Sequence, residues 1–231
     1  MTQAADRKLG LVPALDCDLE RAIEIVSKVD AVEGVYGYKV GFVLGLGYGL
    51  PEVVRRIREK SKKPVIYDHQ KAATDIPDTG VAFAKTLAKA GIDEAILFPQ
   101  AGPATLEAWT RALQAEKLKV IVGGVMTHAK YLASEGGFLQ DDRILGAYAE
   151  AAKLGVKAFV VPMTKPERVR EVAERLGAGD WEFYSPGLGA QGGTFAGFES
   201  VRRHYAIVGR SLLEAADPAG YLRGLMEGRK P

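Results

Sequence analysis

The sequence lacks the features that stabilise secreted proteins or anchor membrane proteins. A single cysteine, Cys17, stands among 231 residues. It excludes an internal disulfide and gives no reason to expect an oxidising compartment. The first eight residues are polar and no long apolar run follows them. We therefore expect neither a signal peptide nor a transmembrane helix, and a cytoplasmic protein.

Excess charge and metal-ligand spacing are also missing. The 31 basic and 29 acidic residues leave a net charge of +2, which gives no reason to expect nucleic acid or an acidic membrane as partner. His69, His128 and His204 show no metal-ligand spacing with one another or with Cys17. No Ser-His-Asp arrangement or Walker loop is present. What remains is an ordinary globular composition, 47% hydrophobic and 26% charged.

Apolar runs of strand type alternate with amphipathic stretches, at intervals of about 25 to 30 residues, the size of a βα unit. Strands are predicted over 10–16, 35–40, 65–68, 95–98, 120–125, 158–161, 181–185 and 205–208. Helices are predicted over 19–26, from Pro51 onward, and over 77–90, 103–116, 141–153, 166–176 and 211–227. The glycine-rich run 41–49 is interpreted as a loop, and Trp109, on a helix face, as a packing residue. Eight such units predict an α/β fold, a (β/α)8 TIM barrel forming one domain over residues 1–231.

Charged and polar residues stand where the predicted strands end. They are Asp16, Lys39, Asp68 with Lys71, Thr127, and Gly209-Arg210. In such barrels catalytic groups lie at the C-terminal ends of the strands, and the loops after strands seven and eight often hold phosphate. These residues are therefore the candidate site.

Lys39, Asp68, Lys71 and Asp75 alternate in charge, an arrangement that keeps lysines protonated and carboxylates ionised. A lysine held in this way is a positioned proton donor. The alternative interpretation is a salt-bridge network that closes the mouth of the barrel.

The glycine-rich segment from Pro186 to Gly193 follows the seventh strand. Its Gly187-x-Gly189-x-x-Gly192 spacing resembles a dinucleotide fingerprint, but no acidic residue ends a following strand. A phosphate loop with Gln191 as a side-chain donor fits the barrel better, and an ordinary turn is the alternative. Val208-Gly209-Arg210-Ser211 adds backbone N–H groups and a guanidinium for a phosphate dianion.

Taken in order, these motifs resemble those of orotidine 5′-phosphate decarboxylase, particularly the short archaeal type. The resemblance covers nearly the whole chain. It rests on Leu15-Asp16, Lys39-Val40-Gly41, Asp68 through Thr79, Met126-Thr127-His128, Pro186 through Gly193, and Val208 through Ser211.

The resemblance implies conversion of orotidine 5′-monophosphate (OMP) to uridine 5′-monophosphate (UMP) and CO2 in de novo pyrimidine synthesis, with no cofactor and no metal. The implied catalytic residues are Lys39, Asp68, Lys71 and Asp75, with Lys71 protonating C6. The implied substrate-binding residues are Asp16, Ile76, Thr79, Thr127, Pro186, Gln191, Gly209 and Arg210. The implied assembly is a homodimer in which Asp75, Ile76 and Thr79 enter the partner's site.

Two positions depart from the family pattern. Asp68-x-x-Lys71-x-x-x-Asp75 is one residue longer on each side of the lysine. Since side chains alternate along a strand, a bulge or early turn is expected to bring Asp68 and Lys71 to one side. Thr127 stands where the family has serine.

Two rival hypotheses remain at this point. The first is a Mg2+-dependent sugar-phosphate decarboxylase of the same barrel superfamily, acting on a substrate such as 3-keto-L-gulonate 6-phosphate. The second is a non-catalytic barrel that binds pyrimidine nucleotides. A magnesium requirement would favour the first, and tight UMP binding without turnover would favour the second.

Overall fold

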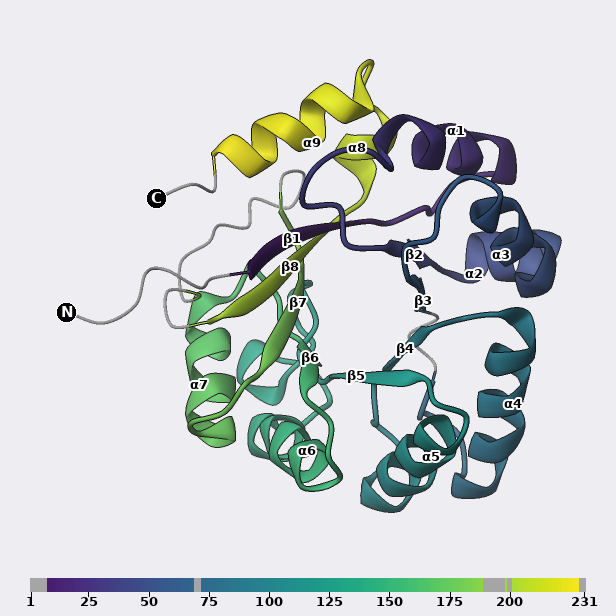
Figure 1. Cartoon of the computed structure of the whole chain (residues 1–231). Helices are drawn as coiled ribbons and strands as arrows, with labels where there is room; N and C mark the ends of the chain where they lie inside the picture. Colours follow the sequence, from purple (N-terminus) through teal and green to yellow (C-terminus); the bar gives the residue numbers. More distant parts are fainter. Residues whose placement is uncertain (1–7, 69–71, 189–197, 199–200, 229–231) are drawn as a thin grey trace.

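The fold is a parallel β-barrel, and the computed structural model describes residues 8–68, 72–188, 198 and 201–228. The strands are β1 (Lys8–Pro13), β2 (Tyr38–Val40), β3 (Val65–Tyr67), β4 (Glu94–Leu97), β5 (Lys119–Gly123), β6 (Ala158–Val160), β7 (Glu182–Pro186) and β8 (Arg203–Val208). They lie in the order β1-β8-β7-β6-β5-β4-β3-β2. Bridges from Leu11 to Val35 and from Ala14 to Lys39 join β1 to the β2 side. The predicted (β/α)8 barrel is confirmed (Figure 1).

Helices connect the strands and surround the barrel (Figure 1). They are α1 (Leu19–Val29), α2 (Phe42–Tyr48), α3 (Leu50–Arg58), α4 (Gly80–Ala90), α5 (Pro103–Ala115), α6 (Asp141–Lys153), α7 (Pro166–Leu176), α8 (Arg210–Leu213) and α9 (Pro218–Glu227), with 3-10 turns η1 (Pro77–Thr79) and η2 (Ala133–Glu135). The predicted bounds of α6 and α7 agree with the structure, because both helices combine a clear apolar period with a proline or acidic first turn.

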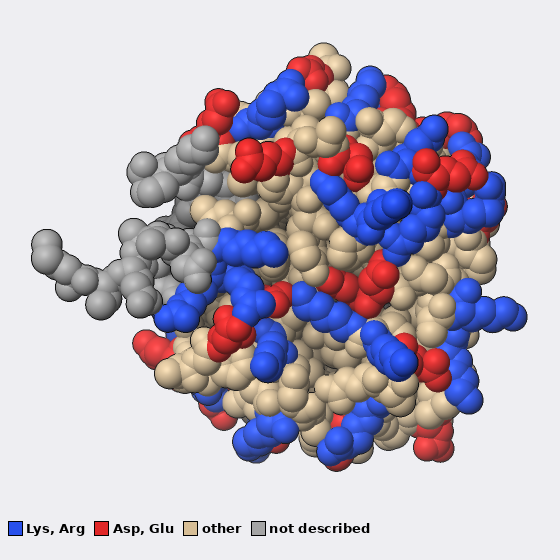
Figure 2. Space-filling view, viewed as in Figure 1, with Lys and Arg blue, Asp and Glu red and all other residues tan. Residues whose placement is uncertain are grey.

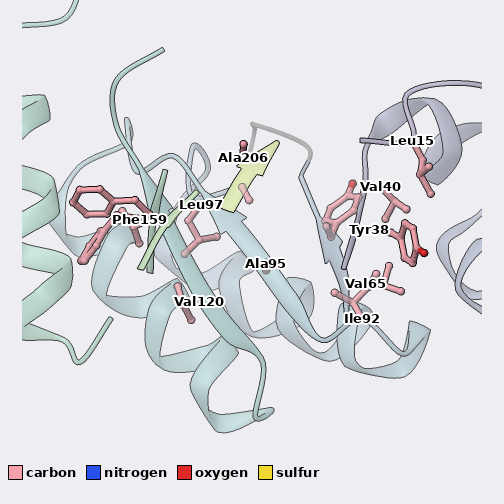
Figure 3. Packing of buried hydrophobic residues seen from close by; sticks show 14 of the residues in the cluster. Leu15, Tyr38, Val40, Val65, Ile92, Ala95, Leu97, Val120, Phe159 and Ala206 are labelled. Atoms are coloured by element: carbon pink, nitrogen blue, oxygen red, sulfur yellow. The ribbon is translucent and has the colours of Figure 1, made fainter. Parts of the chain in front are cut away.

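Alternation along each strand produces two cores. Outward-facing residues such as Val40, Val65, Leu97 and Phe159 pack between the strands and the helices (Figure 3). Inward-facing residues fill the barrel itself; they are Val12, Ala14, Ile66, Ile96, Phe98, Ile121, Ala158, Val160, Tyr184, Tyr205 and Ile207. Because the period is two, the next inward positions after Ala14 and Ile66 are Asp16 and Asp68. The strand register thus brings both carboxylates toward the C-terminal opening of the barrel.

The glycine-rich run 41–49 is not a loop, and that interpretation was wrong. It forms α2, whose Leu44 is fully buried while Leu46 is 74% exposed. Glycine lowers helix propensity, but a buried leucine that packs against the barrel outweighs it. The predicted helix 211–227 is likewise divided into α8 and α9. Asp217 caps the second helix by accepting a hydrogen bond from the Gly220 N–H at 3.0 Å.

A second polar cluster lies at the opposite, N-terminal ends of the strands. The Lys119 ammonium donates to Glu182 and to the Tyr184 hydroxyl, the latter at 2.9 Å. Tyr36 and Tyr184 both donate to the buried carboxylate of Glu94. Burial raises the pKa of Glu94 above its ordinary value, and Lys119 and the two tyrosines offset only part of that rise. At this end of the barrel the polar side chains are hydrogen-bonded to one another.

The outer surface carries charges of both signs. Figure 2 shows basic and acidic side chains interspersed over the visible face, in agreement with the balanced composition. Within the described part of the chain, no helix is both long and apolar enough to cross a bilayer.

Candidate active site

A cavity of about 310 Å³ opens at the C-terminal ends of the strands, within the size range of small-ligand sites. Each strand, or the segment that directly follows it, contributes to the lining. Its lining consists of Ala14, Asp16, Lys39, Asp68, Ile96, Phe98, Val125, Met126, Thr127, Val160, Pro186, Gly187, Leu188, Ile207, Gly209, Arg210 and Ser211. Seven predicted site residues are therefore brought together by the fold: Asp16, Lys39, Asp68, Thr127, Pro186, Gly209 and Arg210.

Lys39 and Asp68 form an ion pair on one side of this cavity. The ammonium nitrogen lies 3.2 Å from Asp68 Oδ2 and 3.4 Å from Asp16 Oδ2. The Asp68 backbone N–H donates to the Val40 carbonyl at 2.9 Å, which holds the two strand ends together. A Cβ on Gly41 would lie 3.0 Å from Asp16 Oδ1 and 3.1 Å from the Asp68 carbonyl oxygen. A glycine at this position thus lets the three segments approach closely.

The electrostatics of the pair keep Lys39 charged. Burial lowers the pKa of the Lys39 ammonium, but the nearby carboxylates of Asp68 and Asp16 raise it by more. The pKa therefore lies above its ordinary value. Asp68 Oδ1 is buried and has no hydrogen-bond partner among the described residues. Since buried carboxylate oxygens are normally paired, this oxygen is available to a group that enters the cavity or to a residue outside the described ranges.

Apolar side chains form the floor of the cavity. Ile96, Phe98, Val160 and Ile207 all belong to the inward-facing set of the barrel. Sequence reasoning missed them, although counting alternate residues back from the strand ends would have found them. A flat, weakly polar ring fits such a floor, with charged groups beside it. Among the described residues, no group of three His, Cys, Asp or Glu side chains is placed to hold a metal ion.

The ends of β7 and β8 supply backbone and cationic groups. Gly187 has φ +110°, a conformation that side-chain-bearing residues rarely adopt, so the turn after Pro186 requires glycine. Arg210 is exposed at the cavity and makes no hydrogen bond or ion pair through its guanidinium with any described residue. Groups of this kind can bind an anion. Gln191 lies outside the described residues.

The backbone around Thr127 accepts hydrogen bonds from side chains of the segment that follows β6. The Thr164 hydroxyl donates to the Thr127 carbonyl at 3.2 Å, and the Lys165 ammonium donates to the His128 carbonyl at 3.0 Å. Lys165 is buried and also pairs with Glu135. Burial raises the pKa of Glu135, but the hydrogen bonds from Lys165 and the Tyr131 N–H lower it below its ordinary value. Nothing in the local sequence around Lys165 indicates this contact.

The described residues on both sides of the lengthened motif are hydrogen-bonded toward β4. Tyr67 is paired with Ala95, and the carbonyl of Ala72 accepts a hydrogen bond from the Phe98 N–H at 3.0 Å. The chain from Tyr67 to Ala72 is therefore longer than the matching stretch of its neighbour, from Ala95 to Phe98. Ala73 then turns with φ +65°. Lys71 itself lies outside the described residues.

The remaining predicted residues, Asp75, Ile76 and Thr79, do not line the cavity of their own chain. Asp75 is exposed and Ile76 is 59% exposed. Two buried donors on α5 hold this segment by its backbone, one of them the indole of Trp109, which donates to the Ile76 carbonyl at 3.0 Å. The sequence predicts Trp109 as a packing residue, and the hydrogen bond of its indole is an additional contact that the sequence does not indicate.

Comparison with known proteins gives one family. Residues 10–225 match the model of the orotidine 5′-phosphate decarboxylase / HUMPS family. The chain is 34% identical over 221 residues to orotidine 5′-phosphate decarboxylase of Methanosarcina mazei, covering 92% of this chain and 91% of that protein. It is 34% identical over 213 residues to that of Methanocaldococcus jannaschii, covering 90% and 92%. A crystal structure of the M. jannaschii enzyme complexed with the inhibitor BMP has a TM-score of 0.82 at 31% identity, covering 95% of this chain and 98% of that one.

Proposed function

This chain belongs to the orotidine 5′-phosphate decarboxylase / HUMPS family, and on that premise we propose that it converts OMP to UMP and CO2 without a cofactor. One observation carries the proposal. A single cavity combines the buried Lys39–Asp68 pair, an apolar floor and the guanidinium of Arg210, which pairs with no described residue. These groups match the reacting carboxylate, the pyrimidine ring and the phosphate of OMP. The reaction would supply UMP in de novo pyrimidine synthesis.

In the proposed reaction, the bond between C6 and the carboxylate carbon breaks and its electron pair stays on C6. The Lys71 ammonium then supplies the proton that completes UMP, while CO2 leaves. Lys39 helps to keep the region cationic, since its raised pKa holds the ammonium charged. Asp68 would lie against the substrate carboxylate. Its buried position, 7% exposed, supports a role inside the cavity rather than at the surface.

The remaining contacts would bind the substrate away from C6. Asp16 and Lys39 would bind ribose hydroxyls, and Thr127 would bind the pyrimidine edge. Gln191, Gly209 and Arg210 would hold the phosphate, and Pro186 would shape the pocket. Binding energy from such remote groups raises the rate when it is used to order the reacting groups. This is the reason to expect strong dependence on the phosphate.

A homodimer completes the proposed site. Asp75, Ile76 and Thr79 would enter the cavity of the partner, which agrees with their position outside their own cavity. Apolar side chains are exposed on the same segment and on α2: Ile76, Val81, Phe42, Leu46 and Tyr48. Exposed apolar surface of this kind is typical of contacts between subunits. α2 leaves the C-terminal end of β2, beside Lys39.

The test is an assay of OMP consumption by absorbance in the presence of EDTA, with wild type and Lys71→Ala. We expect wild-type turnover that EDTA does not change and a variant with almost none. Absence of wild-type turnover would overturn the proposed activity. Mg2+-dependent decarboxylation of a sugar phosphate without OMP turnover would favour a metal-dependent sugar-phosphate decarboxylase. Tight UMP binding without turnover would favour a nucleotide-binding barrel.

A further inference from the structure

Two buried side chains of α5 hold the backbone just before α4. The Thr105 hydroxyl donates to the Asp75 carbonyl at 2.9 Å, and Trp109 Nε1 donates to the Ile76 carbonyl at 3.0 Å. Thr105 is 2% exposed and Trp109 is 4% exposed. Both donors thus meet consecutive carbonyls of an otherwise exposed segment. A buried donor that lost its acceptor would be costly, so each contact resists movement of this backbone.

Packing adds to these hydrogen bonds. A Cβ on Gly80 would lie 2.7 Å from Trp109 Cδ1 and 3.1 Å from Trp109 Cα, so α4 begins in direct contact with the indole. The Trp109 ring lies 4.8 Å from that of Phe83, and the Phe83 ring lies 6.2 Å from that of Tyr67. Tyr67 directly precedes Asp68. The same aromatic row therefore links the Asp75–Ile76 segment to the strand that carries Asp68.

The backbone position also determines where the Asp75 carboxylate lies. Its Oδ1 accepts a hydrogen bond from the Ile76 N–H at 2.7 Å. The Ile76 N–H and the Asp75 carbonyl belong to the same peptide unit, and Thr105 donates to that carbonyl. The carboxylate is therefore attached to a peptide unit that α5 holds in place. Thr79 adds a third contact, since its hydroxyl donates to the Ile76 carbonyl at 2.8 Å. A displacement of this backbone would move the carboxylate with it.

We propose that Thr105 and Trp109 are positioning residues that act on the active site of the partner subunit. The inference rests on the proposed function, in which Asp75 and Ile76 enter the cavity of a second copy. Neither Thr105 nor Trp109 lines the cavity of its own chain. Their contacts fix the segment that crosses, so their effect on catalysis is exerted in trans.

The variants are Thr105→Val and Trp109→Phe, which remove the two donors and keep most of the packing. Since a misplacement of about 1 Å can cost on the order of 100-fold in rate, we expect the double variant to lose roughly 10- to 100-fold in kcat/KM. Thr110→Val is the matched control. Thr110 is also a buried α5 threonine, but its hydroxyl has no hydrogen-bond partner in the described part of the chain. It should keep wild-type kcat/KM.

Mixed dimers separate positioning in trans from a local loss of structure. A Lys39→Ala subunit is co-expressed with the Thr105→Val/Trp109→Phe subunit, and the heterodimer is isolated with two affinity tags. One of its sites then contains an intact Lys39 and receives Asp75 from the subunit with intact Thr105 and Trp109. We expect that site to work normally, which gives about half the activity of a wild-type dimer by the site count alone. Activity no higher than that of the double-variant homodimer would overturn the inference.

A reference heterodimer distinguishes this failure from failure of the proposed function. It combines Lys39→Ala with Asp75→Ala, and it regains activity only if Asp75 crosses between subunits. If the reference heterodimer is active and the first heterodimer is not, only the positioning role of Thr105 and Trp109 is disproved, and the shared site stands. No activity in the reference would disprove the shared site, and the inference with it.

Discussion

The ammonium nitrogen of Lys39 lies 3.2 Å from Oδ2 of Asp68, across the ends of the neighbouring strands β2 and β3. Both residues are buried, with 9% and 7% exposure. A buried ion pair contributes little net stability when intact, but removal of one partner leaves an unpaired buried charge. This relationship couples the proposed catalytic groups to the stability of the fold.

The first prediction follows from that coupling. Lys39→Met should lower the free energy of unfolding by about 3 kcal/mol, because Asp68 loses its main counter-charge. The double variant Lys39→Met/Asp68→Asn should recover most of that loss while remaining inactive. Urea unfolding at neutral pH measures both values. A double variant as unstable as Lys39→Met would show that the pair is not the source of the destabilisation.

The second prediction concerns the dependence of stability on pH at Glu94. Its pKa in the folded state is raised by burial above the ordinary value of 4.5. Above that value the folded protein therefore binds more protons at this site than the unfolded chain, and wild-type stability falls as pH rises. Glu94→Gln lacks this titration. Its unfolding free energy should therefore improve relative to wild type as the pH rises above the ordinary value of 4.5.

Glu135 supplies the contrasting control, because its pKa is lowered in the folded state by Lys165 and the Tyr131 N–H, against the effect of burial. Wild type then gains stability from this group above the ordinary value of 4.5 and loses it as pH falls through the lowered pKa. Glu135→Gln should thus become worse relative to wild type as pH rises. Equal pH dependence in the two variants would contradict both assignments.

A third prediction tests Thr127. Thr127→Ser retains the hydroxyl and should keep kcat/KM for OMP close to the wild-type value. Thr127→Val retains the shape but removes the hydroxyl, so kcat/KM should fall about 10- to 100-fold, the effect of leaving a polar ligand group unpaired. Steady-state kinetics of both variants give the comparison. A valine variant with full activity would exclude base recognition by this hydroxyl.

A fourth prediction concerns Arg210. Loss of a charge-assisted hydrogen bond costs about 1.5 to 3 kcal/mol. Arg210→Ala should therefore raise KM for OMP by about 10- to 150-fold, as that energy implies. The nucleoside orotidine, which lacks the phosphate, should react equally slowly with wild type and variant. If the substitution impaired both substrates to the same extent, Arg210 would not act through the phosphate.

The agreement between sequence and structure depends on the range of each signal. The helices over 141–153 and 166–176 are predicted to the residue, since their apolar period and first turns are local. α2 was missed because glycines at 45 and 47 suggest a loop, whereas the burial of Leu44 against the barrel decides the conformation. Local propensity was outweighed by packing that no single segment encodes.

The candidate site shows the same division. Asp16, Lys39 and Asp68 were identified from their place at strand ends, and the alternation of side chains brings them to one cavity. The roles of Lys71 and Gln191 stay predictions, since both lie outside the described residues. The hydrogen bond from the Lys165 ammonium to the His128 carbonyl was not predictable. Its acceptor is a backbone group, which leaves no signature in the sequence.

By itself, the sequence determined the barrel and the family of this protein, because period-two and helical patterns and strand-end motifs are encoded over short stretches. Tertiary structure alone decided which of the motif residues share a cavity. It separated Asp75 and Ile76 from Asp68, which lies only a few residues earlier, and attached them to Thr105 and Trp109 on α5. The physical reason is that hydrogen bonds and packing join groups that are close in space, whatever their distance along the chain.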